Sequence, residues 1–545
     1  MLRIINGELY DPANQINGQI RDLCVDRGQI VAQLPPDSPV IDATGLIVMP
    51  GGVDIHAHIA GPKVNVGRKL RPEDHRNAVM PRTSVTRSGV GYSVPSTFAT
   101  GYQYARMGYT TVMEAAAPPL LARHVHEELS DIPIIDKGVF VIMGNNYFVL
   151  KYIAAGDFAR LKDYVAWLLS VTGGYVMKLI NPGGVDQWKW GRNVRHLDDP
   201  AATFPVTPRQ IITSLARVQQ ELGIPHPIHV HCNNLGTPGN ARTTLATMQA
   251  VEGRPIHITH IQFNGYGGDD WPTLRSGAPE LVEYINEHPH ITVDLGQVAF
   301  GPTTTMTADG PWEYQLGKLA GSHHRWVNLD LELEGGAGIL PYTFSERNRV
   351  NAVQWATGLE FALSLTDPWR VFLTTDHPNA GPFLSYPEII KLLMQRDYRA
   401  ERLERVHPWA RERSNLSRLD REYSLYDIAI ITRAGPAKSL GLRHKGHLGV
   451  GADADIAIYP KLSDPKEMFS QAKYVIKGGE VIIRDSQFER DQTGQIFHVL
   501  PDYDPDIEMA IREDFEQYYT ISFANYPVNL DHYLPQRQLI GCVKL

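Results

Sequence analysis

Two histidines, His56 and His58, stand at the end of an apolar run that begins at Leu46. If this run is a β-strand, side chains two residues apart point to the same face, so both imidazoles project into one space. Imidazole nitrogens are good ligands for zinc and other transition metals. A His-x-His pair alone is weak support for a metal site, because such pairs also arise by chance. Further ligands are therefore expected elsewhere in the chain.

Other polar side chains follow later apolar segments. Lys178 lies inside the apolar segment Val176–Ile180, where a buried lysine is costly unless it has a partner or a function. The following strand-like segments end in imidazole or carboxylate groups: His229 and His231, then His260, and finally Asp376. Polar residues at the carboxyl ends of barrel strands emerge at the active face. The ordered set is far more specific than any one of its members.

The elements that would position these residues alternate along the middle of the chain. Apolar, strand-like runs occur at 53–58, 109–114, 138–143, 175–180, 227–231, 255–261, 291–295 and 370–376. Longer amphipathic segments lie between them, which is the pattern of a parallel sheet with crossover helices. Eight such units predict an α/β protein with a (β/α)8 barrel. Three long connections, 60–96, 182–206 and 296–346, follow strand ends and are the expected substrate-shaping loops.

Short strands and tight turns occur at both ends of the chain, in residues 1–50 and 454–483. They can pair only if the middle of the chain returns its ends to one place, as a closed barrel does. We therefore predict a composite β-sandwich domain from residues 1–50 and 437–486, and a barrel from residues 51–436. Residues 487–545 form a C-terminal extension with weak periodicity, which we expect to wrap the core or contact a partner.

The composition narrows the partners and the compartment. A net charge of −8 gives no sign of a nucleic-acid-binding protein, which would show a basic excess. The three cysteines are far apart and odd in number, so a disulfide framework is not expected. The first residues become polar too early for a signal peptide, and no apolar run is long enough to span a membrane. We expect a cytoplasmic protein without a membrane or nucleic-acid partner.

The ligand order His-x-His, Lys, His, His, Asp resembles that of the binuclear-metal amidohydrolase superfamily, and the resemblance covers nearly the whole chain. It implies that Lys178 is carboxylated on its side-chain nitrogen and bridges two metal ions. It further implies that His56, His58 and Asp376 hold one ion and that His231 and His260 hold the other. Zinc fits imidazole and carboxylate ligands. Asp376 would accept a proton from the attacking water and pass it to the leaving amine.

Several other residues leave alternatives open. His229 shares a face with His231 and is the rival ligand, although His231 is favoured because it ends the strand. Cys232 and His257 are out of phase with the ligands, so we expect Cys232 to pack as a small residue and His257 to point into the helix layer. Histidines outside the predicted strands are expected at the surface, namely His124, His126, His323 and His324.

Within the superfamily, four segments look like the A component of formylmethanofuran dehydrogenase and of the related formyltransferase/hydrolase complex: Pro50–Gly61, Arg82–Ser84, Gly144–Asn146 and Met177–Gly184. This resemblance implies reversible hydrolysis of the N-formyl group of a methanofuran-type one-carbon carrier, giving formate and the free amine. It also implies a complex with other subunits, one of them a formyltransferase. Two alternatives remain, a cyclic-amide hydrolase related to dihydropyrimidinase or hydantoinase, and a non-catalytic scaffold subunit.

The first long connection is basic, whereas the whole chain is acidic. Methanofuran-type carriers have a tail of glutamates, so Arg68 and Lys69 in this loop are candidate contacts for the tail. A solvated loop or a subunit contact is an equally good explanation of its charge. Asn233, which follows the His231 strand, is a further candidate for substrate binding.

Overall fold

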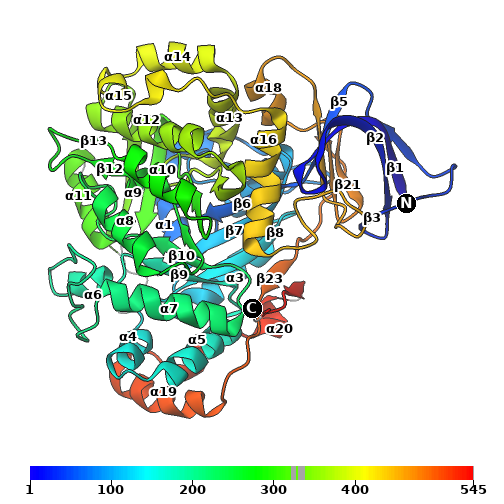
Figure 1. The fold of residues 1–545 in the computed structure, drawn as a ribbon. Coiled ribbons are helices and arrows are strands. Elements are labelled where there is room, and N and C mark those ends of the chain that lie inside the picture. The colour runs from blue at the N-terminus through cyan, green and yellow to red at the C-terminus, as the bar shows by residue number, and fades with distance from the viewer. Residues whose placement is uncertain (321–326, 329–337, 535, 544–545) are drawn as a thin grey trace.

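The computed structural model describes residues 1–320, 327–328, 338–534 and 536–543. Eight parallel strands pair in chain order around a barrel (Figure 1). The last strand is joined to the first by a bridge between Ala57 and His377, where the amide of His58 donates to the carbonyl of His377 at 2.6 Å. The barrel strands are β6 (Gly52–Ala57), β7 (Tyr109–Ala117), β8 (Asp136–Ile142), β9 (Val176–Ile180), β10 (Ile228–His231), β11 (Ile256–Ile258), β14 (Ile291–Asp294) and β18 (Val371–Phe372). The predicted (β/α)8 barrel is confirmed.

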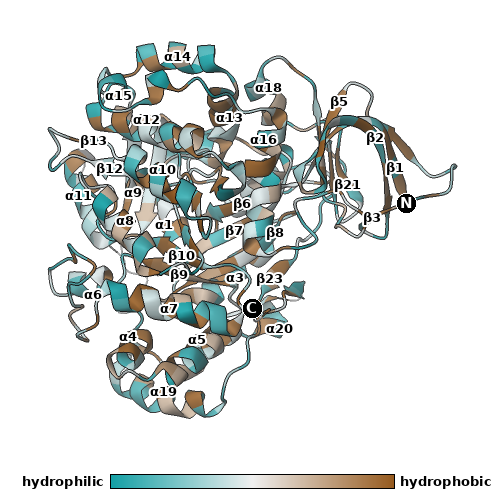
Figure 2. Cartoon of the chain, in the orientation of Figure 1, coloured by the Kyte–Doolittle hydropathy of each residue, from teal (hydrophilic) through white to brown (hydrophobic). Residues whose placement is uncertain are grey.

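Several helices that follow the barrel strands are amphipathic, and some carry clear end signals. Helix α7 (Pro208–Leu222) begins with a capping box between Thr207 and Gln210, and it ends at Gly223 in the left-handed conformation. The other helices between strands include α2 (Thr97–Arg106), α3 (Ala122–Asp131), α5 (Phe158–Thr172), α8 (Ala241–Ala250), α10 (Ala278–Glu287) and α12 (Arg349–Ser364). Figure 2 shows α14 (Arg396–Arg405) largely hydrophilic at the periphery, whereas the central strands carry hydrophobic segments.

Two barrel strands are shorter than the sequence predicts. The predicted segments 255–261 and 370–376 end early as β11 and β18. The backbone of His260 has φ 37° and that of Asp376 has φ 47°, so both lie in the left-handed region. A residue in that conformation cannot continue a β-ladder, because the chain turns there. Both turns fall on predicted metal ligands.

The two chain ends share one nine-stranded sheet. Strand β5 (Leu46–Pro50) from the N-terminal part pairs antiparallel with β19 (Ile456–Pro460) from the C-terminal part. The remaining strands are β1 (Leu2–Asp11), β2 (Ile16–Asp26), β3 (Gln29–Val31), β4 (Val40–Asp42), β20 (Tyr474–Lys477), β21 (Glu480–Arg484) and β22 (Gln487–Phe488). Figure 1 shows this strand-rich part beside the barrel. The domain limits drawn from the sequence stay a prediction.

A buried group of opposite charges joins the barrel to this sheet. We call Asp136, Lys445, Asp455 and Lys477 the junction cluster. The ammonium of Lys445 lies 2.6 Å from Asp136 and 2.7 Å from Asp455, and that of Lys477 lies 2.8 Å from Asp136. Asp136 begins strand β8 of the barrel, whereas Lys477 ends strand β20 of the sheet. The cluster therefore ties the start of a barrel strand to the sheet domain.

The C-terminal extension wraps the barrel. Strand β23 (Ile496–His498) pairs with the first residues of β8, and helix α19 (Asp506–Tyr518) lies beside α4 (Tyr147–Ala154) and α5 (Figure 1). The ring of Trp167 on α5 stacks on Tyr526 with centroids 5.3 Å apart. This arrangement buries an aromatic cluster that the weak periodicity of the sequence does not reveal.

One predicted surface residue lies in the interior. His126 on α3 is fully buried, and its Nε2 atom lies 2.8 Å from the carbonyl oxygen of Thr172. The prediction of a surface position was wrong, because α3 is covered by the C-terminal extension as well as by the barrel. His323 and His324 fall outside the described residues. Across the described parts of the chain, every helix is too short or too polar to span a lipid bilayer.

Candidate metal centre

The six predicted metal ligands line one cavity at the carboxyl ends of the barrel strands: His56, His58, Lys178, His231, His260 and Asp376. A single carboxylate oxygen, Oδ1 of Asp376, lies 2.9 Å from Nε2 of His56 and 3.2 Å from Nε2 of His58. The ligand atoms of His56, His260 and Asp376 all lie within 4.8 Å of one another. Residues far apart in the sequence therefore converge on one small volume.

Local backbone geometry places these side chains. His56 and His58 project together because β6 has the strand alternation of side chains. His260 and Asp376 instead enter the cavity from left-handed turns just beyond their strands. Gly296 packs directly on His260, and a Cβ atom at this glycine would lie 2.2 Å from Cβ of His260. A larger residue at 296 would therefore displace His260.

The donor set fits a divalent transition metal. Burial lowers the pKa of His56 and of His260 well below the usual range, and it lowers the pKa of His58 to about 4. These imidazoles are neutral at pH 7, which is the form that binds metals. Among the described residues, buried Nζ of Lys178 has no hydrogen-bond partner, and buried Nε2 of His56 makes no hydrogen bond although Oδ1 of Asp376 lies 2.9 Å away. Buried polar atoms without partners are costly, so a further group at this position would satisfy them.

Lys178 has the properties expected of a lysine that reacts as a neutral amine. Its side chain is 1% exposed, and burial lowers its pKa to about 7. A neutral amine is the form that combines with CO2, whereas an ammonium is not nucleophilic. The neighbouring strand β10 pairs with β9 so that His229 lies opposite Lys178.

Three buried carboxylates that sequence reasoning did not select lie around the centre. Glu114 accepts hydrogen bonds from the amides of Ile59 and Ala60 at 2.7 and 3.0 Å. Asp294 accepts from the amide of His260 at 2.8 Å. Glu114 lies in the C-terminal half of β7 and Asp294 ends β14, so the strand-end rule that found the ligands could have found both. The third, Asp309, comes from a segment between strand β15 (Gly301–Thr307) and helix α11 (Gly310–Ala320), where no such signal exists.

Two of the uncertain histidines lie inside the barrel. His229 does not line the cavity, and its Nε2 atom lies 2.8 Å from Nδ1 of His56, on the side away from Asp376. His257 stacks on His229 with ring centroids 4.4 Å apart, and its Nε2 atom lies 3.0 Å from Asp294. The prediction that His257 points into the helix layer was wrong. It assumed that His260 continues the strand, whereas the turn at His260 changes the phase.

The cavity continues from the centre as an apolar space with a few polar groups. Its wall includes the aromatic rings of Phe263, Trp312 and Phe344, and its polar lining includes Lys63, Glu313 and Asn379. Lys63 lies on helix α1 (Pro62–Leu70) and Glu313 on α11. Both belong to the long connections that are predicted to shape the substrate site.

The three predicted substrate contacts lie outside this cavity lining. Arg68 forms an ion pair with Glu128, and its Nε atom donates to the carbonyl of Pro95 at 2.7 Å. Lys69 is exposed near the end of α1. Asn233 is buried and donates to Asn181 and to the carbonyl of Pro182 at 2.7 and 2.9 Å. Their roles in substrate binding stay predictions.

A closed (β/α)8 barrel with imidazole, lysine and carboxylate groups gathered at its carboxyl face defines a hydrolase of the metal-dependent amidohydrolase type. The comparison with known sequences agrees with this class. The chain belongs to the amidohydrolase family, whose sequence profile matches residues 39–483.

Within that family the chain is similar over nearly its whole length to two named relatives. It is 49% identical to protein FwdA of Methanocaldococcus jannaschii, over 96% of each chain. It is 40% identical to the A component of the formyltransferase/hydrolase complex Fhc of Methylorubrum extorquens, over 89% of each chain. The chain therefore belongs to the family that contains these two proteins.

The comparison with solved structures agrees with the sequence comparison. The crystal structure of the complex FhcABCD from Methylorubrum extorquens with methylofuran contains a chain that superposes with a TM-score of 0.93 at 36% identity, covering 99% of this chain and 100% of that one. The N-acyl-D-glutamate deacylase of Bordetella bronchiseptica superposes with a TM-score of 0.52 at 15% identity, over 91% of this chain and 98% of that one. The second likeness shows the fold alone.

Proposed function

We propose that this chain is the hydrolytic subunit of a formyltransferase/hydrolase complex and that it hydrolyses, reversibly, the N-formyl group of a methanofuran-type carrier. The products are formate and the free amine of the carrier. The main support is that the side chains at all six ligand positions of the family line one cavity. The 40% identity to the A component of Fhc and the TM-score of 0.93 to a chain of FhcABCD in complex with methylofuran support this assignment.

The proposed centre holds two divalent ions, for which zinc is the best fit to the imidazole and carboxylate donors. His56, His58 and Asp376 would hold one ion, His231 and His260 the other, and carboxylated Lys178 would bridge them. When bound, such a metal pair supplies an activated water and polarises the formyl oxygen. Two buried nitrogens support this arrangement: Nζ of Lys178, which has no hydrogen-bond partner among the described residues, and Nε2 of His56, which makes no hydrogen bond to the nearby Asp376.

Asp376 is the proposed proton carrier. Its Oδ1 atom faces His56 and His58 at 2.9 and 3.2 Å, while Nδ2 of Asn379 lies 3.0 Å from the same oxygen and donates to it. A carboxylate held in this way can take a proton from the attacking water and deliver it to the amine that leaves the formamide. The amine must be protonated to leave, so this transfer completes the reaction.

The apolar part of the cavity is the proposed site of the carrier's heteroaromatic ring. Phe263 and Trp312 stand side by side on its wall with ring centroids 6.3 Å apart. Aromatic side chains bind planar rings through offset or edge-to-face contacts. The ring would lie beside the metal centre, with the charged tail leading out of the cavity.

The proposed partners are the other subunits of the complex, one of them a formyltransferase. The sequence contains no recognisable redox-centre motif, so any redox step would belong to another subunit. The cytoplasmic location predicted from the cysteine content stays a prediction. The identity of the metal and the carboxylation of Lys178 are also proposals.

The test uses the purified complex. Metal content and formate release from an N-formyl furfurylamine compound are measured for the wild type and for Lys178→Ala. About two zinc ions per chain with activity, both lost in the variant, would support the proposal. Hydantoin and dihydrouracil are assayed in parallel. Turnover of these cyclic amides without formate release would identify a cyclic-amide hydrolase, and a metal-free, inactive wild-type complex would indicate a scaffold subunit.

A further inference from the structure

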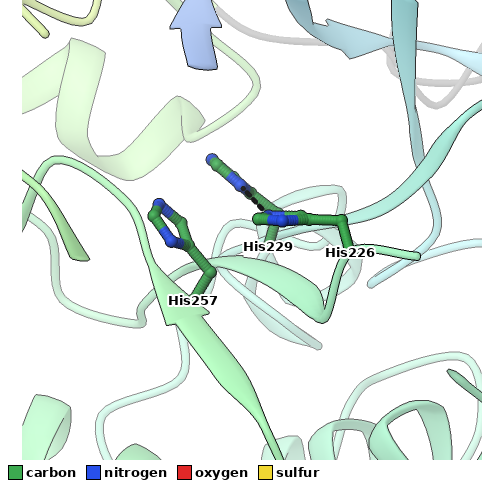
Figure 3. A group of neighbouring side chains, drawn as sticks. All are labelled: His226, His229 and His257. Atoms are coloured by element: carbon green, nitrogen blue, oxygen red, sulfur yellow. Dashed lines mark hydrogen bonds between the residues drawn. The ribbon is translucent and has the colours of Figure 1, made fainter. Parts of the chain in front are cut away.

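A line of histidines runs from the metal centre towards the opposite end of the barrel. Nδ1 of His56 lies 2.8 Å from Nε2 of His229, and Nδ1 of His229 lies 3.1 Å from Nε2 of His226. Nδ1 of His226 lies 2.8 Å from the carbonyl oxygen of Ser439. We call these three residues and the Ser439 carbonyl the histidine chain. Figure 3 shows the bonded pair His226 and His229, with His257 beside them.

The far end of the chain fixes the direction of its hydrogen bonds. A carbonyl oxygen only accepts hydrogen bonds, so Nδ1 of His226 must carry the proton. His226 and His229 are both fully buried, and an imidazole buried among neutral partners is the neutral ring, which carries one proton. Nε2 of His226 is then an acceptor, and Nδ1 of His229 donates to it. The only proton of His229 is then on Nδ1, so Nε2 of His229 is an acceptor. Nδ1 of His56, which faces it, must be the donor.

The acceptor at the far end is supplied by a helix terminus. Ser439 lies in the last turn of helix α17 (Gly435–Leu440), which ends at Gly441 in the left-handed conformation. Carbonyls in a last turn have no partner within their own helix and must be satisfied from outside. The hydroxyl of Ser439 lies farther from His226, at 3.4 Å, and does not replace the carbonyl.

A second contact also indicates that the proton of His56 lies on Nδ1. Oγ1 of Thr259 lies 2.6 Å from Nδ1 of His56. The hydroxyl of Thr259 hydrogen-bonds to the carboxylate of Asp294, whose pKa lies well below the usual range although burial alone would raise it. A hydroxyl has one proton, so a hydroxyl that donates to Asp294 accepts from His56. Both neighbours of Nδ1 of His56 are therefore acceptors.

The same hydrogen bonds exclude a metal ion among His226, His229 and His257, whose nitrogens lie close enough to hold one. Nε2 of His257 faces the carboxylate of Asp294 at 3.0 Å and donates to it, while Nδ1 lies 2.9 Å from the hydroxyl of Thr292. With the histidine chain in place, every nitrogen of the three rings is used. No set of lone pairs remains to converge on an ion.

We propose that His229 and His226 are positioning residues for the metal centre: they hold His56 as the tautomer with the proton on Nδ1 and so present the lone pair of Nε2 to the metal. This inference rests on the proposed function, because it takes His56 to be a metal ligand. Partners that fix the tautomer and ring orientation of a ligating histidine strengthen metal binding. Here the orienting group is a relay of two neutral rings that ends on a backbone carbonyl.

The test compares two substitutions at one position. In His229→Gln the carboxamide oxygen can still accept from His56, whereas His229→Leu removes this acceptor and leaves only the hydroxyl of Thr259 beside Nδ1. Zinc is removed from the purified complex by competition with a chelator, and the ions retained per chain are measured. We expect His229→Leu to weaken zinc binding by about 10- to 100-fold and His229→Gln to stay within about threefold of the wild type.

The matched control is His126→Leu. His126 is also a buried histidine bonded to a carbonyl, but it lies on α3 and has no contact with the centre. Its replacement should lower the melting temperature and leave zinc affinity unchanged. Equal zinc affinity in the Leu and Gln variants at position 229 would overturn the inference while leaving the proposed centre intact. A wild-type complex that binds no metal would overturn both.

Discussion

The Oδ2 atom of Asp309 lies 3.0 Å from Nε2 of His231, so a carboxylate from a loop reaches the histidine at the end of strand β10. Its other oxygen, Oδ1, accepts a hydrogen bond from Asn181 at 3.1 Å. The ligands expected on this side of the cavity are only the imidazoles of His231 and His260 besides Lys178. Asp309 brings a carboxylate from the long connection 296–346 up to the proposed second metal position.

Asp309→Asn is therefore expected to weaken the second metal ion selectively. The amide keeps the size of the side chain and one of its two acceptor oxygens, but it removes the charge. We expect about 10- to 100-fold weaker binding of one ion per chain, measured as zinc retained during chelator competition.

Glu313→Gln is the matched control for this substitution. Glu313 lines the cavity of the proposed centre, and its burial raises the pKa of its carboxyl well above the usual range, which favours the uncharged form. Replacement by a neutral amide should leave zinc binding unchanged. If the two variants lose zinc to the same extent, the charge of Asp309 is not what holds the ion.

Lys178 leads to a prediction about pH. Because burial lowers its pKa to about 7, the side chain is mostly neutral above pH 7 and mostly protonated below it. Only the neutral amine reacts with CO2. Metal-free protein supplied with zinc and bicarbonate should thus load metal more completely at pH 8 than at pH 6, where roughly a tenth of the amine is neutral.

The histidine ligands with lowered pKa values do not change their protonation state between pH 6 and pH 8. The pKa of His58 is about 4 and those of His56 and His260 are well below the usual range, so these rings are neutral at both pH values. The measurement is zinc per chain after gel filtration, with and without bicarbonate. Loading that does not depend on bicarbonate at either pH would contradict the carboxylation of Lys178.

The barrel, and the gathering of the six candidate residues at its carboxyl face, could be predicted because they depend on local patterns. The roles of these residues as metal ligands came from the family resemblance and stay a prediction. Each of the eight strands is a short apolar run, and five of them carry a residue type that is unusual in a core, as Lys178 and His231 illustrate. The composite sheet followed from the turn chemistry at the two chain ends. These signals lie within a few residues of one another, so a single sequence contains them.

The residues that were placed wrongly or missed have positions that depend on backbone turns and on contacts distant in the sequence. His257 was placed on the wrong side because the left-handed turn at His260 shifts the phase of the strand. Asp309 has no strand-end motif to mark it and reaches the site only through the fold of the long connection. His126 is buried partly by helix α20 (Leu530–Tyr533), close to the end of the chain, which no local pattern indicates.

The junction cluster leads to a prediction about stability. Burial alone would raise the pKa values of Asp136 and Asp455, but the charges of Lys445 and Lys477 lower both below the usual range. Lys445→Met leaves these carboxylates buried with one cation fewer. We expect a loss of about 3–5 kcal/mol in the free energy of unfolding, measured by chemical denaturation.

The control for the junction cluster is the exposed pair between Lys461 and Glu8, which lie 2.7 Å apart. Lys461→Met should cost less than about 1 kcal/mol. The pH dependence has a definite sign. Carboxylates with lowered pKa values stabilise the fold above about pH 4, and this stabilisation is lost as the pH falls through their folded values. A Lys445→Met variant with wild-type stability and acid sensitivity would contradict the role of the cluster.

The basic loop gives the last prediction, on the recognition of the carrier's tail. Lys69 is exposed, whereas Arg68 also pairs with Glu128, so Lys69→Ala is the cleaner variant of the two. Loss of one exposed charge contact should raise KM up to about fivefold for a carrier with a long glutamate tail and leave KM for a truncated carrier unchanged. Arg68→Ala should add a loss of stability, and Lys461→Ala, on the sheet domain, should change neither KM. An equal rise in KM for both carriers in Lys69→Ala would show that this loop does not read the tail.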